Sequence, residues 1–314
     1  MSAGRVLVAG SANLDFVVRA AHIPAPGETV LGREFQTFPG GKGANQAVAA
    51  ARAGGADTRM LLALGDDAHA VPVEASLREA GVALDIRRQT AHATGVAFIC
   101  LSDGAENAIT VAPGANAALV ADDLPDLAGV DTLLLQLETP IDAVTAWATR
   151  AREAGVRVVL NAAPARILPD ALLRQVDVLI VNEGELAMIA HQADDLISAL
   201  KCVPVPAVVV TLGAVGCIAR DGTDLHLQPA FPVAAVDTTA AGDTFCGVLV
   251  ATLARGATLV AGLRAAAAAS ALACTALGAQ SSVPARADVD ALLRGDADSA
   301  GLDALAARCA SSAA

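Results

Sequence analysis

The stretch from residue 131 to residue 161 reads DTLLLQLETPIDAVTAWATRAREAGVRVVLN. Its two ends, DTLLLQLE and VRVVLN, are short and almost wholly apolar, as are strands of a parallel sheet that is covered on both faces. Residues 141–154, between them, have the pattern of an amphipathic helix. Strand, helix and strand in this order predict a parallel β/α unit.

The same alternation extends in both directions from this stretch. Further apolar runs at 5–10, 59–65, 176–183 and 206–213 predict strands, and 43–53, 71–80 and 186–190 predict helices. We therefore expect a three-layer α/β/α fold with a mainly parallel central sheet, in one domain over residues 1–294. Residues 16–38 and 94–111 interrupt the alternation with turn-rich hairpin patterns and predict a small β-sheet lid. Residues 295–314 are small, polar and Ala-rich, and predict a poorly ordered C-terminal tail.

Composition narrows the class of protein. The 314 residues carry a formal net charge of -12, which argues against nucleic acid as the main partner because such binders need a basic surface. The uncharged runs 202–219 and 265–285 contain Pro, Gly or polar residues, so we interpret them as buried core and not as membrane spans. The N-terminus lacks a signal-peptide pattern, and the six cysteines have no CxxC spacing, so we expect free thiols in the reducing cytoplasm.

A carboxylate stands where a helix is expected to begin, in DTTAAGDTFCG at 237–247. If the helix starts near Ala241, the N–H groups of Ala241, Gly242 and Asp243 are unpaired and form an anion hole. Gly242 would allow close approach and unusual backbone angles, and Asp243 could accept a proton from an alcohol. The combination predicts phosphoryl transfer to a hydroxyl. By itself, however, Asp243 could be an ordinary N-terminal helix charge.

A glycine-rich turn, FPGGKGANQ at 38–46, precedes another predicted helix. It has neither P-loop spacing nor the dinucleotide-binding fingerprint. Its glycines would let the backbone approach a polar ligand such as a sugar, with Lys42 and Asn45 as donors. A plain helix start with a surface lysine is the alternative.

Polar residues also follow several of the predicted strands. Asn13 and Asp15 lie two apart in an extended segment, so they face the same way and offer a donor and an acceptor to a vicinal diol. Glu138, Asn182 and Glu185 lie just beyond other strands, where ligands bind in α/β folds. Each of these three could instead be a helix cap or a surface group.

The motifs GSANLD, PAPGETV, GGKGANQAVAAAR, APGANAAL, NAAPAR, TLGAVG, DTTAAGDTF and GAQSSVP occur in this order. Together they resemble the ribokinase-like sugar kinase family over about residues 5–293. The resemblance implies ATP-dependent phosphorylation of the 5-hydroxyl of D-ribose. It implies that Asp243 is the catalytic base and that the Ala241 and Gly242 amides stabilise the transferring phosphoryl group.

The resemblance also assigns binding residues. The sugar ligands would be Asn13, Asp15, Gly41, Lys42, Asn45, Glu138 and Asp243. The nucleotide site would include Asn182, Glu185, Thr211, Gly213 and Gly216, with Asn182 and Glu185 also organising Mg²⁺. A K⁺ site would use the side chains of Asp237 and Ser282 and the carbonyls of Thr239, Ala273, Ala276 and Gly278. The lid would close over the sugar and form a homodimer.

Two positions depart from the family pattern: Cys246 replaces a usual Asn, and Ala276 replaces a frequent Arg. Neither substitution removes a catalytic group. The sequence leaves two alternatives open, a kinase for another sugar such as 2-deoxyribose or fructose, and a non-catalytic sugar-binding regulator. The glycine before Asp243 and the Asn182–Glu185 pair argue against the regulator.

Overall fold

The computed structural model describes residues 3–104, 107–190, 195–295, 301–302, 305–306 and 308–309. In this part of the chain the main sheet has nine strands, in the order β13-β12-β11-β10-β9-β8-β1-β4-β5. The strands are β1 (Arg5–Ala9), β4 (Asp57–Gly65), β5 (Ala83–Gln89), β8 (Thr132–Leu135), β9 (Arg157–Asn161), β10 (Val178–Asn182), β11 (Ala207–Thr211), β12 (Gly216–Asp221) and β13 (Asp224–Pro229). In this order, the strands from β11 to β5 run parallel to one another. Strands β12 and β13 are antiparallel additions at the edge beside β11.

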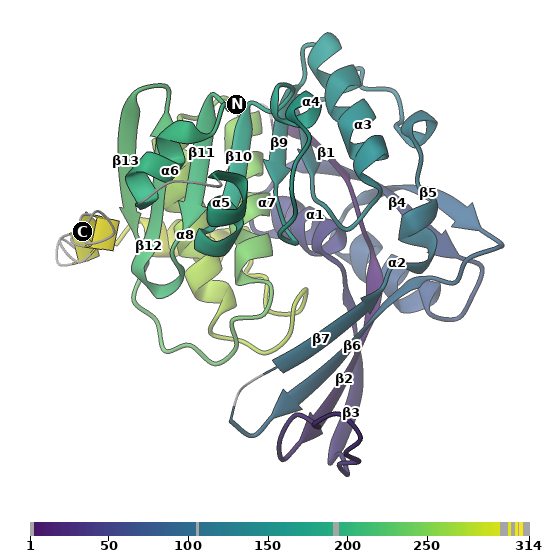
Figure 1. Cartoon of the computed structure of the whole chain (residues 1–314). Helices are drawn as coiled ribbons and strands as arrows, with labels where there is room; N and C mark the ends of the chain where they lie inside the picture. Colours follow the sequence, from purple (N-terminus) through teal and green to yellow (C-terminus); the bar gives the residue numbers. More distant parts are fainter. Residues whose placement is uncertain are drawn as a thin grey trace.

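Helices cover both faces of this sheet (Figure 1). One face carries α1 (Lys42–Arg52), α2 (Ala70–Glu79), α7 (Ala241–Ala254), α8 (Leu259–Ala273) and α9 (Arg286–Leu293), and the other carries α3 (Ile141–Glu153), α4 (Asp170–Leu173), α5 (Glu183–Ala190) and α6 (Leu196–Cys202). Strand β1 shows why both faces are apolar. Val6 and Val8 enter one core, whereas Leu7 and Ala9 enter the other, because successive side chains of a strand point to opposite faces. The predicted three-layer fold is confirmed.

The two predicted interruptions form a second sheet. It contains β2 (Asn13–Ala20), β3 (Glu34–Gly40), β6 (Gly95–Ser102) and β7 (Asn107–Ala112), in the order β3-β2-β6-β7. The hairpins β2–β3 and β6–β7 are antiparallel, and β2 and β6 join them in parallel. Figure 1 shows this sheet, which we call the lid, extending away from the body. The predicted lid is confirmed.

Short elements complete the chain. The 3₁₀ turns are η1 (Gly114–Ala118), η2 (Ala121–Asp123) and η3 (Gly213–Val215). Helix α5 begins at Glu183, earlier than the helix expected at 186–190. Most of the predicted tail at 295–314 lies outside the described residues, but Leu305 and Cys309 are buried. No helix in the described ranges is long and apolar enough to cross a membrane.

The topology gathers several chain segments at one edge of the main sheet. Strand β1 lies between β8 and β4, so the chain leaves it in one direction toward β4 and returns on its other side at β8. Ligands of open parallel sheets bind beyond the carboxyl ends of the strands at such a switch point. Only residues 10–12 separate β1 from the first strand of the lid, so the lid continues directly from this edge.

Candidate active site

Helix α7 begins at Ala241, as the sequence predicts. The N–H of Ala241 donates to the carbonyl of Thr238 at 3.2 Å, so this predicted anion-hole donor already has a partner. Within the part of the chain that the structure describes, the N–H groups of Gly242 and Asp243 have no acceptor. Together with the positive end of the helix dipole, they can bind an anion.

The backbone angles at the start of α7 show where the chain turns. The left-handed residue is Ala240, with φ of 56°, and not Gly242, whose missing side chain would have allowed unusual backbone angles. The chain reverses at the residue before the first turn of the helix, and Gly242 already lies in that turn. A Cβ built on Gly242 meets nothing within 4 Å. The space beside Gly242 is therefore open to a ligand.

The carboxylate of Asp243 is buried, and amide side chains from α1 hold both of its oxygens. Asn45 Nδ2 donates to Oδ2 at 3.0 Å, and Gln46 Nε2 donates to Oδ1 at 2.9 Å. Helices α1 and α7 can come this close because Gly247 has no side chain. A Cβ at Gly247 would lie 2.5 Å from the carbonyl oxygen of Gln46.

The end of β1 and the start of the lid carry the predicted sugar ligands Asn13 and Asp15. The Oδ1 of Asn13 accepts from Asn116 Nδ2 at 2.8 Å, so its own Nδ2 is left to donate to a ligand. Burial, together with the charges of Glu138 and Asp243, raises the pKa of Asp15 to about 7. Asp15 is thus close enough to Glu138 and Asp243 for their charges to act on it. A donor beside an acceptor is the arrangement expected for a vicinal diol.

The start of α1 packs against this region. Gly41 precedes α1 with φ of 87°, and a Cβ there would lie 2.8 Å from the N of Asn13. Glu138 Oε2 accepts from Ser11 Oγ at 2.5 Å and from the Lys42 N–H at 3.0 Å. The Asp243 carboxylate, followed by Glu138, raises the pKa of the Lys42 ammonium. The structure thus brings all the predicted sugar ligands to one region.

A cavity of about 160 Å³ lies beside Asp243, and we call it the central cavity. It is lined by Lys42, Asn161, Ala163, Ile180, Val181, Asn182, Glu185, Thr211, Ala240, Gly242, Asp243 and Cys246. Cys246, the departure from the family pattern, is thus part of its wall.

Asn182 and Glu185, in the same wall, cap α5. The N–H of Asn182 donates to Glu185 Oε2 at 2.8 Å, and the N–H of Glu185 donates to Asn182 Oδ1 at 2.8 Å. This reciprocal pair is a capping box, so the helix-cap alternative is correct for the two residues. Burial raises the pKa of Glu185. The two side chains nevertheless face the same space as Asp243.

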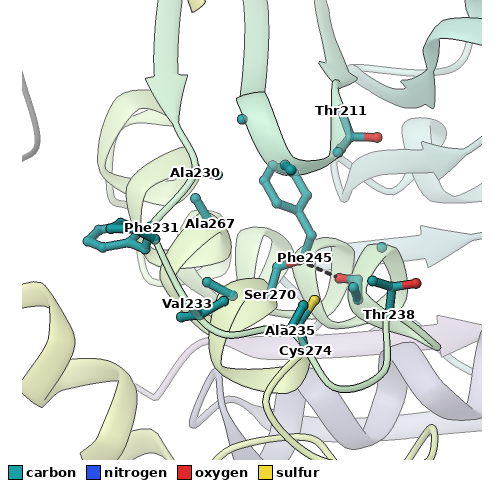
Figure 2. Close-up of a pocket in the computed structure, with 17 residues that line it drawn as sticks. Thr211, Ala230, Phe231, Val233, Ala235, Thr238, Phe245, Ala267, Ser270 and Cys274 are labelled. Carbon is teal, nitrogen blue, oxygen red and sulfur yellow. Dashed lines mark hydrogen bonds between the residues drawn. The ribbon is translucent and has the colours of Figure 1, made fainter. Parts of the chain in front are cut away.

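Gly242 also lines a second pocket of about 420 Å³, which we call the outer pocket. Figure 2 shows this pocket. Thr211, Gly213 and Gly216 line it, as predicted for a nucleotide site. Most of the rest of its wall is apolar and includes Ala230, Phe231, Val233, Ala235, Phe245, Ala267 and Cys274. Ser270 Oγ donates to the carbonyl of Ala241 at 2.9 Å, which ties α8 to the start of α7. An apolar pocket of this kind suits a flat heteroaromatic ring.

The predicted K⁺ ligands lie on the loop before α7, at the last residue of α8 and on the loop that follows α8, and the two loops meet at Asp237. Asp237 Oδ1 accepts from the Thr239 N–H at 2.9 Å, and Oδ2 accepts from the Gly278 N–H at 2.9 Å. Although burial acts in the opposite direction, these bonds and one from the Thr239 hydroxyl lower the pKa of Asp237. Ser282 is buried and donates to the Ala279 carbonyl at 3.0 Å. The carbonyl ligands assigned to Thr239, Ala273, Ala276 and Gly278 stay predictions.

Sequence reasoning assigned no role to several residues of the site. Gln46, Asn116, Gln136, Asn161 and Gln280 are all buried and hydrogen-bonded near Asp243 or Asn13. A polar side chain within an apolar run, such as Gln136 in LLLQLE, is the signal that could have identified one of them, since buried polar groups need partners.

Comparison with known proteins shows the family to which the chain belongs. Residues 3–286 match the model of the pfkB family carbohydrate kinases. The chain is 39% identical to the ribokinase of Haemophilus influenzae, with 89% of this chain and 95% of that protein aligned. It is 38% identical to the ribokinase of Bacillus subtilis, over 92% of this chain and 99% of the relative.

A solved structure has the same fold. The Arabidopsis thaliana ribokinase, determined with ribose and ATP, superposes with a TM-score of 0.87 at 33% sequence identity. The match covers 94% of this chain and all of that one (100%). Fold, motifs and near-complete coverage agree, and the chain belongs to the pfkB family of carbohydrate kinases.

Proposed function

We propose that this kinase transfers the γ-phosphoryl group of ATP to the 5-hydroxyl of D-ribose. The position of Asp243 carries the proposal. Its carboxylate lies among the predicted sugar ligands and lines the central cavity, and the adjacent Gly242 lines both the central cavity and the outer pocket. A sugar hydroxyl and a nucleotide phosphate would therefore meet beside one carboxylate.

The polar groups around Asp243 suit a sugar. Asn13 offers a donor and Asp15 an acceptor, so together they would hold a vicinal diol. Asn45, the Gly41 backbone and Glu138 would bind other hydroxyls. The Lys42 ammonium lines the central cavity, where it would also neutralise charge on the transferring group.

The transfer itself needs little covalent chemistry from the protein. Asp243 would accept the proton of the 5-hydroxyl while the hydroxyl oxygen attacks the γ-phosphorus and the bond to the departing ADP breaks. The free N–H groups of Gly242 and Asp243, at the start of α7, would stabilise the charge on the phosphoryl oxygens. The outer pocket would hold the adenine ring.

Two cations complete the proposal. In the described ranges, no three His, Cys, Asp or Glu side chains form a metal cluster. This fits Mg²⁺, which binds mainly to substrate phosphates and water with one or two protein groups; Asn182 and Glu185 would hold it through water. Bound Mg²⁺ would neutralise phosphate charge. For K⁺, Asp237 together with the carbonyls assigned to Thr239, Ala273, Ala276 and Gly278 would supply an all-oxygen donor set of the kind this ion accepts.

The lid is proposed to close over the sugar and to pair with the lid of a second copy. On one of its faces the rings of Phe16, Phe35 and Phe98 stack, with centroid distances of 6.0 Å and 5.5 Å from Phe16. Phe35 is 64% exposed and Phe98 is 55% exposed. Exposed apolar patches of this kind mark interaction surfaces.

The test is ADP release from MgATP with D-ribose, 2-deoxyribose and D-fructose in parallel, each with K⁺ or with Na⁺ alone. We expect ribose-dependent turnover that K⁺ increases, and Asp243→Asn should lower kcat by roughly 10²–10⁴-fold without unfolding the protein. A higher kcat/KM for another sugar would reassign the substrate. A folded Asp243→Asn variant with a normal rate would refute the role of the base.

A further inference from the structure

Buried amide side chains surround Asp243. Two of them, Gln46 and Gln136, line neither the central cavity nor the outer pocket. We infer that Gln46 is a positioning residue that aims the Asp243 carboxylate and that Gln136 fixes Gln46 in the only useful orientation. The inference rests on the proposed role of Asp243 as the base. It concerns two residues that have no contact with sugar or nucleotide in that proposal.

The hydrogen bonds form a chain with one direction. A carboxylate only accepts, so the amide nitrogen of Gln46 must face Asp243. Gln46 Nε2 donates to Asp243 Oδ1 at 2.9 Å and to Asn161 Oδ1 at 3.0 Å, which uses both of its protons. Gln46 Oε1 then faces the other way and accepts from Gln136 Nε2 at 2.6 Å. The charge of Asp243 thus sets the orientation of each amide in turn.

Gln136 is the last residue in this chain of hydrogen bonds, and one of its own polar atoms has no partner. Its Oε1 is buried and has no partner among the described residues, and it lies against Gly10, where a Cβ would approach it to 1.9 Å. An unpaired buried oxygen is unfavourable. The hydrogen bond that the nitrogen of the same amide donates to Gln46 explains why this unfavourable oxygen is retained.

The other carboxylate oxygen is held in the same way. Asn45 Nδ2 donates to Asp243 Oδ2, and Asn45 Oδ1 accepts from Gln280 Nε2 at 3.2 Å. Gln280 Oε1 in turn accepts from Ser76 Oγ at 2.6 Å. Both oxygens of the base are therefore fixed by amides that cannot turn over without losing a partner, and the remaining lone pairs stay directed at the acceptor hydroxyl.

The decisive variant is Gln136→Glu. When protonated, the new side chain can donate to Gln46 Oε1 as the amide does. When ionised, it only accepts, so Gln46 must turn and present its Oε1 to the Asp243 carboxylate. We therefore expect the ratio of its kcat to that of the wild type to fall by about tenfold or more as pH rises, since burial places a glutamic acid pKa above its usual value.

Companion variants separate positioning from folding. Gln136→Met has similar size without a donor, and should lower kcat by a factor that does not vary with pH. Both variants retain the titratable groups that face the site (Asp15, Lys42, Glu138, Glu185 and Asp243), so a difference between them belongs to position 136. Thr132→Val, on the adjoining strand β8, removes another buried polar atom without a partner and should leave kcat unchanged. KM for sugar should stay within about threefold in all three.

The outcomes distinguish this inference from the proposed function. If Asp243→Asn is inactive and Gln136→Glu keeps a pH-independent ratio to the wild type, the positioning role is refuted and the base remains. If Asp243→Asn is active, the proposed role of Asp243 as the base is refuted, and the positioning role that depends on it is refuted as well. If Gln136→Glu does not fold, the variant Gln46→Met tests the same inference. We expect it to lower kcat by about 10- to 100-fold at constant KM, and an unchanged kcat would overturn the inference.

Discussion

Gly242 offers a direct test of the proposed path of the phosphoryl group. It lines both cavities, its backbone is helical, and a Cβ built on it meets no atom within 4 Å. The variant Gly242→Ala therefore adds a methyl group to empty space. Replacing glycine by alanine at a compatible position stabilises a protein by about 0.4–1 kcal/mol, so we expect a Tm that is unchanged or higher by up to about 3 °C.

Activity should change in the opposite direction. If phosphoryl oxygens approach the Gly242 N–H, the methyl group displaces them, and a displacement of about 1 Å lowers the rate by about 10²-fold. We expect kcat with ribose to fall by roughly that factor while the protein becomes no less stable. The assay is steady-state ADP release combined with thermal unfolding of the same preparation.

Gly247→Ala is the matched control on the same helix. There the new Cβ would lie 2.5 Å from the Gln46 carbonyl oxygen and 2.6 Å from the Ala49 Cβ, so the free energy of unfolding should fall by about 1–3 kcal/mol. A Gly242→Ala enzyme with normal kcat and KM for ATP would show that the phosphoryl group does not pass this residue. A large drop in its Tm would contradict the open space that we describe.

Further predictions concern stability and assembly. Ala240→Gly should raise the free energy of unfolding by about 1 kcal/mol in urea titrations, because it relieves a left-handed alanine; a lower value would contradict strain at this residue. The pKa of Asp15 is about 7 in the folded chain against an ordinary value of 3.8, so the folded state binds the proton more tightly and stability falls as pH rises from about 4 to 7. Asp15→Asn should remove that fall in stability, which is worth at most about 4 kcal/mol. If Tm depends on pH in the same way in the wild type and in Asp15→Asn, both measured without sugar, the raised pKa of Asp15 is refuted. Phe35→Glu combined with Phe98→Glu should convert a dimer into monomers by light scattering, whereas Val71→Glu, at an exposed position on α2, should not.

Much of the fold could be predicted because its signals are local. The apolar runs around β1, β8 and β10 show burial on both faces, and turn residues mark the hairpins of the lid. The start of α7 at Ala241 also followed from a local change, from small polar residues to a long apolar run. Such signals need no knowledge of distant contacts.

The supporting residues of the site could not be predicted in this way. Gln46 and Gln280 lie inside motifs that carried the family resemblance, yet nothing near them in the sequence shows that one bonds Asp243 and the other Asn45. Nothing in the sequence around Gly242 marks the nearby Ala240 as the left-handed residue at which the chain reverses before the helix. The spacing of Asn182 and Glu185 did contain a recognisable local signal, that of a capping box.

The hydrogen bonds that hold Asp243 also have a consequence for how the enzyme becomes active. Asn45 and Asp243 are 198 residues apart, and Asn45 and Gln280 are 235 apart. Contacts between such distant residues form slowly, because a long loop must close before they contribute. During synthesis, the first half of the chain therefore emerges long before the partners of its amides. In refolding from denaturant, we expect recovery of kinase activity to lag behind recovery of helical circular dichroism.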